Sequence, residues 1–301
     1  MTDYVVRHST VYRYNQNVPE SLHLMHLRPR DTPRQRVVEA NLTVAPEPSA
    51  WIKRRDAFGN ETDWVSLDDA HDTLTVSASA LVEASPLPQS WGETEAWERV
   101  RERLADPSDA AARDAVAYLF DSPMIWFQSD VAAYAMKSFA PGRPILDAAR
   151  DLMIRIQKDF RYDTGVTDVS TPVDKVFAIR AGVCQDLAHV GIAALRSIGL
   201  AARYVSGYLL TQPPPGKEKM LGSDASHAWF SVWCPPVGWV DFDPTNAVLP
   251  SDQHITLAFG RDYSDVAPIA GIVFGGGDHV IEVGVDVIPV ADAGPADPPL
   301  P

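Results

Sequence analysis

An amphipathic helix followed by an alternating strand, in the second half of the chain, constrains the fold more than any other feature. Between Cys184 and Ile198, apolar or small side chains recur every three or four residues, which is the pattern of a helix that buries one face. Gly199 then fits the position that ends a helix. Residues 225–234 instead alternate between apolar and mixed positions, as a strand with one buried face does. These patterns predict a helix packed against a sheet.

The first part of the chain, residues 1–88, is predicted to be a β domain. Short runs rich in β-branched, aromatic or aliphatic residues are separated by turn signals such as Phe58-Gly59-Asn60. Strands at this spacing are typical of a β-sandwich. The runs cover residues 4–10, 22–27, 37–44, 63–67 and 73–82.

Residues 89–290 are predicted to hold a helical segment and a second, α+β unit. Helical spacing of Ala, Leu, Ile and Arg favours helices over 109–119 and 145–156. Further strands are expected over 201–210, 225–234, 238–242 and 279–288. Proline and glycine predict a surface loop at 211–222, and the Pro-, Ala- and Asp-rich tail at 291–301 is expected to be disordered.

The overall charge argues against one class of partner. The 301 residues carry a formal net charge of −14, and such a surface repels phosphate backbones, so nucleic-acid binding is not expected. The N-terminus lacks the pattern of a secretory signal, and no apolar run has the length of about 18 residues needed to span a bilayer. Two cysteines do not make a disulfide framework. We therefore expect a cytoplasmic protein without a membrane partner.

Cys184 is the first candidate for chemistry. It lies in the first turn of the predicted helix, where partial positive charge stabilises a thiolate and free backbone N–H groups can stabilise an oxyanion. The alternative is a buried structural cysteine, which is the commoner fate of this residue type.

His227 is the second candidate. Along residues 225–234, Ala228, Phe230, Val232 and Cys234 share an apolar face, whereas His227 shares the other face with Trp229, Ser231 and Trp233. A histidine on that mixed face can act as a general base. The alternative is a strand histidine that only makes a local hydrogen bond.

Asp243 completes the candidate site. A hairpin turn at residues 235–237 would place Asp243 opposite or diagonal to His227, and such cross-strand neighbours lie roughly 5 to 8 Å apart. Asp241 lies on the same face and is the rival partner of His227. Either carboxylate has the alternative of a solvated position at a strand end.

Other clusters are weaker. Cys184, His189, His227 and Cys234 do not have zinc-ligand spacing, and the alternation puts Cys234 on the face opposite His227. We predict no metal, no cofactor and no disulfide between the two cysteines. Asp186 and His189 are three residues apart on the helix and could pair with each other and brace the loop that bears the site, or they could face solvent.

Several motifs are similar to those of one family, the bacterial transglutaminase-like proteins. Gly-Val-Cys-Gln-Asp-Leu-Ala-His at 182–189 resembles the family's nucleophile motif. The family's later motifs are similar to Ser-His-Ala-Trp at 226–229 and Gly-Trp-Val-Asp-Phe-Asp-Pro-Thr-Asn at 238–246. Residues 160–163 and 260–266 also look like that family, as do Tyr12-Arg13-Tyr14 and Leu27-Arg28-Pro29 of its N-terminal β domain.

The resemblance implies a papain-like α+β core, with the nucleophile helix against an antiparallel sheet. It also implies a triad of Cys184, His227 and Asp243, in the chain order of papain-like enzymes. Members of the family include cross-linking transglutaminases, peptidases and amidases. We therefore expect acyl transfer at the amide bond of a peptide or protein through a thioester, with net hydrolysis. The alternatives are transamidation and a catalytically silent scaffold; the oligomeric state is not predicted.

Roles for the remaining polar residues follow from the same logic. Acyl transfer usually needs a second oxyanion donor beside the cysteine amide, and Gln157, Tyr162 and Trp229 are the candidates. Asp262 and Tyr263 are expected either to line the cleft or to hold a loop. Histidines of the β domain, at positions 8, 23, 26 and 71, are scattered over different segments, so we expect that domain to have a structural or substrate-positioning role.

Overall fold

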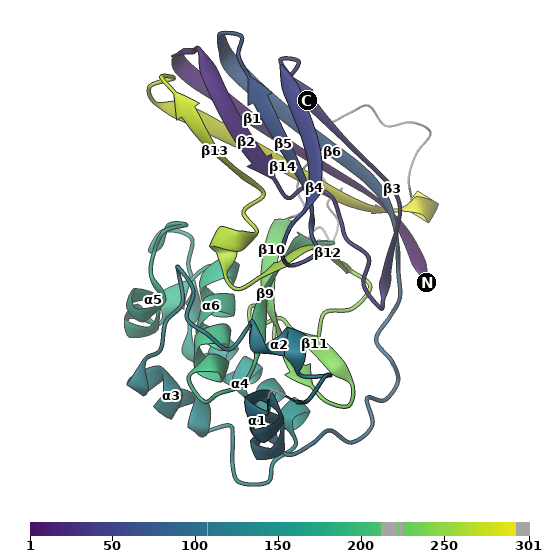
Figure 1. The fold of residues 1–301 in the computed structure, drawn as a ribbon, viewed down its shortest axis with the longest axis vertical. Coiled ribbons are helices and arrows are strands. Elements are labelled where there is room, and N and C mark those ends of the chain that lie inside the picture. The colour runs from purple at the N-terminus through teal and green to yellow at the C-terminus, as the bar shows by residue number, and fades with distance from the viewer. Residues whose placement is uncertain (107, 212–221, 223–224, 293–301) are drawn as a thin grey trace, which may run out of the picture.

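The computed structural model describes residues 1–106, 108–211, 222 and 225–292. Most of the loop predicted at 211–222 and of the tail predicted at 291–301 lies outside these described residues. Figure 1 shows two parts, a β-sandwich and a unit in which helices surround a separate sheet. The predicted α+β class is confirmed.

The β-sandwich consists of two antiparallel four-stranded sheets. Its core contains Met25, Leu42, Val65 and Leu74, with partly buried aromatic side chains such as Trp51 packed against them. The first sheet has the order β14-β1-β6-β3, with β14 at His279–Pro289, β1 at Thr2–Val18, β6 at His71–Ala84 and β3 at Gln35–Ala45. The second has the order β13-β2-β5-β4, with β13 at Ile269–Phe274, β2 at Glu20–Met25, β5 at Glu61–Leu67 and β4 at Ala50–Arg55.

Two C-terminal strands complete this sandwich. In the register, β14 places Val287 opposite Val6, and β13 places Ile269 opposite Met25. From the sequence, these residues were expected in the second unit, at 89–290. The pairing instead puts them in the sheets of the N-terminal strands. Alternation along 279–289 predicts a strand with one buried face, but it carries no information about which distant strand is the partner.

The helices lie in the second unit. Helices α4 (Ile145–Asp159) and α6 (Cys184–Arg196) confirm two predictions, whereas the helix expected over 109–119 was wrong in extent, because only α2 (Arg113–Val116) forms there. The Asp109 carboxylate accepts hydrogen bonds from the N–H groups of Ala111 and Ala112, and this local turn replaces a first helical turn. Helices α1 (Trp97–Ala105), α3 (Ser129–Met136) and α5 (Val173–Ile179) were not predicted.

A third antiparallel sheet supports α6. It has the order β11-β10-β9-β12, with β11 at Gly238–Phe242, β10 at Ala225–Cys234, β9 at Ala202–Leu209 and β12 at His254–Gly260. The predicted helix-on-sheet arrangement is confirmed, since α6 packs on β10. The approach is close: a Cβ atom at Gly191 would lie 2.5 Å from the Phe230 ring. Strand β12 was not predicted.

Short elements complete the chain. Strands β7 (Arg161–Tyr162) and β8 (Ala181–Gly182) form a parallel pair just before α6. Two 3-10 turns, η1 (Tyr263–Asp265) and η2 (Val290–Asp292), follow β12 and β14. Among the helices of the described residues, none is both long enough and apolar enough to cross a bilayer.

Candidate active site

Cys184 is the first residue of α6, and the loop before it is held in place by Asp186. The Asp186 Oδ2 atom accepts hydrogen bonds from the Val183 N–H at 2.8 Å and from the Thr167 hydroxyl at 2.7 Å. A Cβ atom at Gly182 would lie 2.5 Å from this same oxygen, so the motif needs glycine there. Because Cys184 begins the helix, its N–H has no intrahelical acceptor. The Cys184 side chain is partly exposed.

His227 joins Cys184 to Asp243. Its Nε2 lies 2.8 Å from Asp243 Oδ2, and both side chains are buried. Asp243 lies diagonally across the hairpin from His227, because the register pairs Phe230 with Phe242. Burial alone would lower the pKa of His227, but hydrogen bonds with Asp243 and Cys184 raise it to about 10. The imidazole therefore favours its charged form.

Asp243 is held by the residues that directly follow it. The N–H groups of Thr245 and Asn246 donate to Oδ1 at 2.9 and 3.2 Å, and the Asn246 side chain donates to Oδ2 at 2.8 Å. Burial would raise the pKa of Asp243, but the hydrogen bonds from His227, His254 and Asn246 lower it. An ionised carboxylate only accepts hydrogen bonds, so His227 donates from Nε2 and turns its other nitrogen to Cys184.

His254 is a site residue that sequence reasoning missed. It begins β12, and its Nε2 lies 3.2 Å from Asp243 Oδ2, on the oxygen that His227 also contacts. The indole of Trp229 packs against this imidazole, with ring centroids 5.3 Å apart. Nothing in the sequence signals the contact, because β12 lacks the alternation of a half-buried strand and is buried along its whole length.

The three side chains His227, Asp243 and His254 could also hold a metal ion, since their ligand atoms lie within 4.8 Å of one another. The hydrogen bonding argues for a different role. Both imidazoles donate to the same carboxylate oxygen, and a metal would have to replace both protons. Both imidazoles already have Asp243 as a hydrogen-bond partner, so the residues form a hydrogen-bonded triad with an additional histidine.

A cleft of about 460 Å³ opens onto the sulfur, and it is termed here the Cys184 cleft. Its walls come from both parts of the molecule. The α+β unit contributes Tyr204 and Tyr263, and the sandwich contributes His8 and Tyr12 from β1 and Val283 from β14. Burial lowers the pKa of His8 to about 4, so this histidine is neutral at pH 7. No Asp, Glu, Lys or Arg among the described residues lines this cleft.

Two family descriptions match this chain. Residues 4–83 match the bacterial transglutaminase-like N-terminal region, and residues 132–244 match the transglutaminase-like superfamily. An uncharacterized protein of Mycobacterium tuberculosis is 41% identical over 295 residues, which cover 95% of this chain and 92% of the relative. The chain belongs to the transglutaminase-like superfamily.

Two further comparisons place this transglutaminase-like chain among known proteins. A protein-glutamine gamma-glutamyltransferase of Pseudomonas aeruginosa is 32% identical over 108 residues, which is 34% of this chain and 16% of that protein. The crystal structure of a candidate cysteine protease from Cytophaga hutchinsonii shares the fold, with a TM-score of 0.73 and 21% identity. The match covers 99% of this chain and 93% of that one.

The predicted oxyanion donors of this transglutaminase-like core lie in three different places. Gln157 is exposed near the end of α4 and does not line the Cys184 cleft. Trp229 is fully buried and lines a different cavity. Tyr162 is close to the sulfur: its strand pairs with β8, and burial together with the charge of Cys184 raises its pKa. Tyr204, which was not predicted, lines the cleft and has its pKa raised by the same two causes.

Asp262 and Tyr263 divide the two roles that were expected of them. Asp262 is buried and accepts hydrogen bonds from the Met124 N–H at 2.8 Å and from Ser264, so it holds a loop. Tyr263 lines the Cys184 cleft, and its N–H donates to His189 Nε2 at 3.2 Å. Asp186 and His189 are both buried and have other partners, so the expected pairing and the solvent-facing alternative were wrong. Asp186 does brace the loop that bears the site, as expected.

Proposed function

We propose that this protein is a cysteine-nucleophile acyl-transfer enzyme, with Cys184, His227 and Asp243 as its triad. The observation that carries the proposal is the buried hydrogen bond between His227 and Asp243, on an imidazole that also bonds to a thiol at a helix N-terminus. A nucleophile, a base and a group that orients the base are the parts that acyl transfer requires.

The geometry supports the following sequence of steps. The Cys184 thiolate attacks the carbonyl carbon of an amide, and the negative charge moves to the carbonyl oxygen. In this scheme the Cys184 N–H and a phenol, from Tyr162 or Tyr204, donate to that oxygen; Tyr204 lines the cleft, and the charge of Cys184 acts on Tyr162. His227 then gives its proton to the leaving amine as the C–N bond breaks, which leaves a thioester. Water, deprotonated by His227, attacks the thioester and releases the acid and the thiol.

The lining of the Cys184 cleft supports a peptide or protein amide as the substrate. Aliphatic and aromatic side chains predominate, and among the described residues no Asp, Glu, Lys or Arg lines the cleft. A charged group on the substrate would lose its hydration in such a cleft without gaining a partner. We therefore expect neutral, apolar residues on either side of the susceptible amide.

The position of the tryptophans supports hydrolysis over transamidation. Transamidation needs a site that binds an amine beside the thioester and excludes water. Trp229 and Trp239 could have walled such a site, but they line a cavity that includes neither Cys184 nor His227. That cavity carries three arginines, which repel a protonated amine. The cytoplasmic location also stays a prediction.

A competition between water and an amine tests the reaction. Glutamine-containing peptides with apolar neighbours are incubated with the protein, with and without excess primary amine, and the products are read by mass spectrometry. We expect free acid or cleaved peptide to predominate and Cys184→Ala to abolish both. If amine adducts outnumber free acid and cleaved peptide at millimolar amine, the protein is a transglutaminase. A catalytically silent scaffold would give neither adduct nor hydrolysis product.

A further inference from the structure

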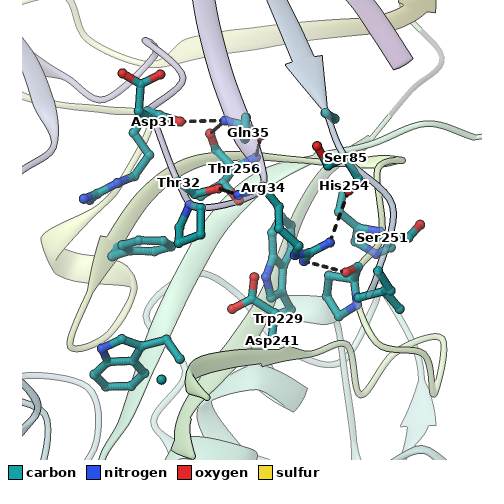
Figure 2. Close-up of a pocket in the computed structure, with 18 of the residues that line it drawn as sticks. Asp31, Thr32, Arg34, Gln35, Ser85, Trp229, Asp241, Ser251, His254 and Thr256 are labelled. Atoms are coloured by element: carbon teal, nitrogen blue, oxygen red, sulfur yellow. Dashed lines mark hydrogen bonds between the residues drawn. The ribbon is translucent and has the colours of Figure 1, made fainter. Parts of the chain in front are cut away.

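A second cavity of about 440 Å³ lies between the catalytic sheet and the sandwich. Strands β9 to β12 form one side, and residues 30–35 together with the segment that follows β6 form the other. Figure 2 shows Arg34, Trp229, Asp241 and His254 around it. It is separate from the Cys184 cleft, and we call it the arginine cavity after Arg30, Arg34 and Arg203 in its wall.

The three arginines have no carboxylate partner within ion-pair distance in the described part of the chain. Arg203 lies between two rings, with its guanidinium carbon 3.5 Å from the Phe259 centroid and 4.3 Å from that of Trp239. Arg34 donates to the Pro250 carbonyl at 2.9 Å, and Arg30 donates to the Phe58 carbonyl at 3.1 Å.

Two carboxylates of the wall do not neutralise these cations. Asp31 is exposed and accepts the Val37 N–H, and Asp241 affects Arg203 only at longer range. The wall thus has three positive charges against two negative ones, on a chain whose net charge is −14. Burial lowers the pKa of Arg203 to about 10, although Asp241 opposes this effect. A bound anion would compensate for the lost hydration of the guanidinium.

Buried nitrogens without partners gather at the same cavity. The Nε atoms of Arg30 and Arg203, Nε1 of Trp229 and Nδ1 of His254 have no hydrogen-bond partner among the described residues, and all four residues line the arginine cavity. Buried polar atoms are rarely left without a partner. Their convergence points to a polar ligand rather than to an empty structural gap.

The wall also has an apolar part, beside polar residues such as Thr32, Ser85 and Ser251. The indoles of Trp91, Trp229 and Trp239 face the cavity, together with Leu87 and Val237. Its volume falls in the range of small-molecule sites, which is roughly 300 to 1,000 Å³. We propose that the arginine cavity is a second ligand site, which binds a small organic carboxylate with a flat, apolar body. The carboxylate lies against the arginines and the body against the tryptophans.

The arginine cavity adjoins the proposed triad on the side away from the Cys184 cleft, at His254 and Trp229. His254 contributes to the cavity wall, while its Nε2 is hydrogen-bonded to Asp243. Trp229 likewise lines the cavity and packs against His227, with ring centroids 6.0 Å apart. The proposal does not depend on the reaction catalysed at Cys184, because binding alone defines the site.

Calorimetric titration of the full chain tests the site with matched probes. The carboxylates are 3-phenylpropionate and indole-3-acetate, and the neutral controls are the corresponding amides. We expect each acid to bind about tenfold more tightly than its amide, because hydrogen bonds to a charged group are the stronger kind. Equal binding of acid and amide, or no heat of binding for either acid at millimolar concentration, would overturn the proposal.

Two variants and a control locate the binding. Arg34→Gln should remove most of the preference for acid over amide, whereas Arg36→Gln should not. Arg36 lies two residues away, but it is exposed and paired with Glu83. Ser251→Phe should block both probes by filling the cavity while all three arginines remain. Circular dichroism checks that the variants are folded, and unchanged binding in a folded Ser251→Phe protein would place the probes elsewhere.

Discussion

Asp243 and His254 are joined by a hydrogen bond of 3.2 Å, on the same carboxylate oxygen that binds His227 at 2.8 Å. The carboxylate thus lies between two imidazoles, and the second one comes from β12, a strand that contributes no member of the triad. Because Asp243 orients His227, a residue that fixes Asp243 acts on catalysis through it.

His254 is therefore expected to be a positioning residue. His254→Ala should lower kcat by about 10- to 100-fold, the usual effect of losing such a supporting contact, and should leave KM little changed. His254→Gln retains an N–H donor and should restore part of the rate, which a purely structural role would not require. Steady-state kinetics on a cleaved peptide measure both, and a loss confined to KM would contradict the role.

Asp243, and not Asp241, should be the carboxylate on which activity depends. Asp243→Asn is expected to lower kcat by up to about 10⁴-fold, as the loss of the orienting charge does in other triads. Asp241→Asn should have little effect, because Asp241 lines the arginine cavity, away from His227. Comparable losses in the two variants, measured with the same peptide, would overturn the assignment.

The sequence predicted the elements whose patterns are local. The helix at Cys184 was predicted from the spacing of apolar residues within it. The hairpin that carries His227 and Asp243 was predicted from the turn between two adjacent strands. The sequence could not predict the position of His254, because only the pairing of β12 with β9 brings it to Asp243. The same limit explains why residues 269–289 were expected in the second unit, although they form β13 and β14 of the sandwich.

Trp229 shows a second limit of pattern reasoning. Alternation put Ala228, Phe230, Val232 and Cys234 on one apolar face, and all four belong to the same hydrophobic core. The other face is buried as well, since Trp229 and Ser231 are fully buried. Alternation could not show that the face shared by His227 and Trp229 borders two different spaces. His227 lines the Cys184 cleft near one end of the strand, and Trp229, two residues on, lines the arginine cavity.

The pH dependence of stability should reflect His227. Its pKa is raised from 6.5 to about 10 in the folded protein, so the folded state holds a proton that the unfolded state releases. The stabilisation is complete below pH 6.5 and is lost as the pH rises through about 10. The difference in unfolding free energy between wild type and His227→Gln should shrink across this interval in urea titrations. A difference that grows with pH would contradict the charged imidazole.

His8 should contribute to substrate binding and not to the reactivity of Cys184. Its Nδ1 lies 2.9 Å from the Tyr208 hydroxyl, and its side chain lines the Cys184 cleft. His8→Ala should destabilise the protein by about 1 to 3 kcal/mol, because it leaves a buried hydroxyl without its partner, and should raise KM. The alkylation rate of Cys184 should stay close to that of wild type. His23→Ala is the matched control, since His23 bonds locally to Ser21 and lines no part of the cleft.

Cys184 should be the thiol that reacts with electrophiles. It is partly exposed at a helix N-terminus beside a charged imidazole, whereas Cys234 is fully buried and burial strongly raises its pKa. Iodoacetamide at neutral pH should therefore add one label to the wild-type chain and one to Cys234→Ala, but none to Cys184→Ala within the same time. His227→Gln should slow the labelling, because the thiolate loses the cation that stabilises it. Intact-mass spectrometry follows the reaction, and peptide mapping locates the label; a label found first on Cys234 would exclude Cys184 as the activated nucleophile.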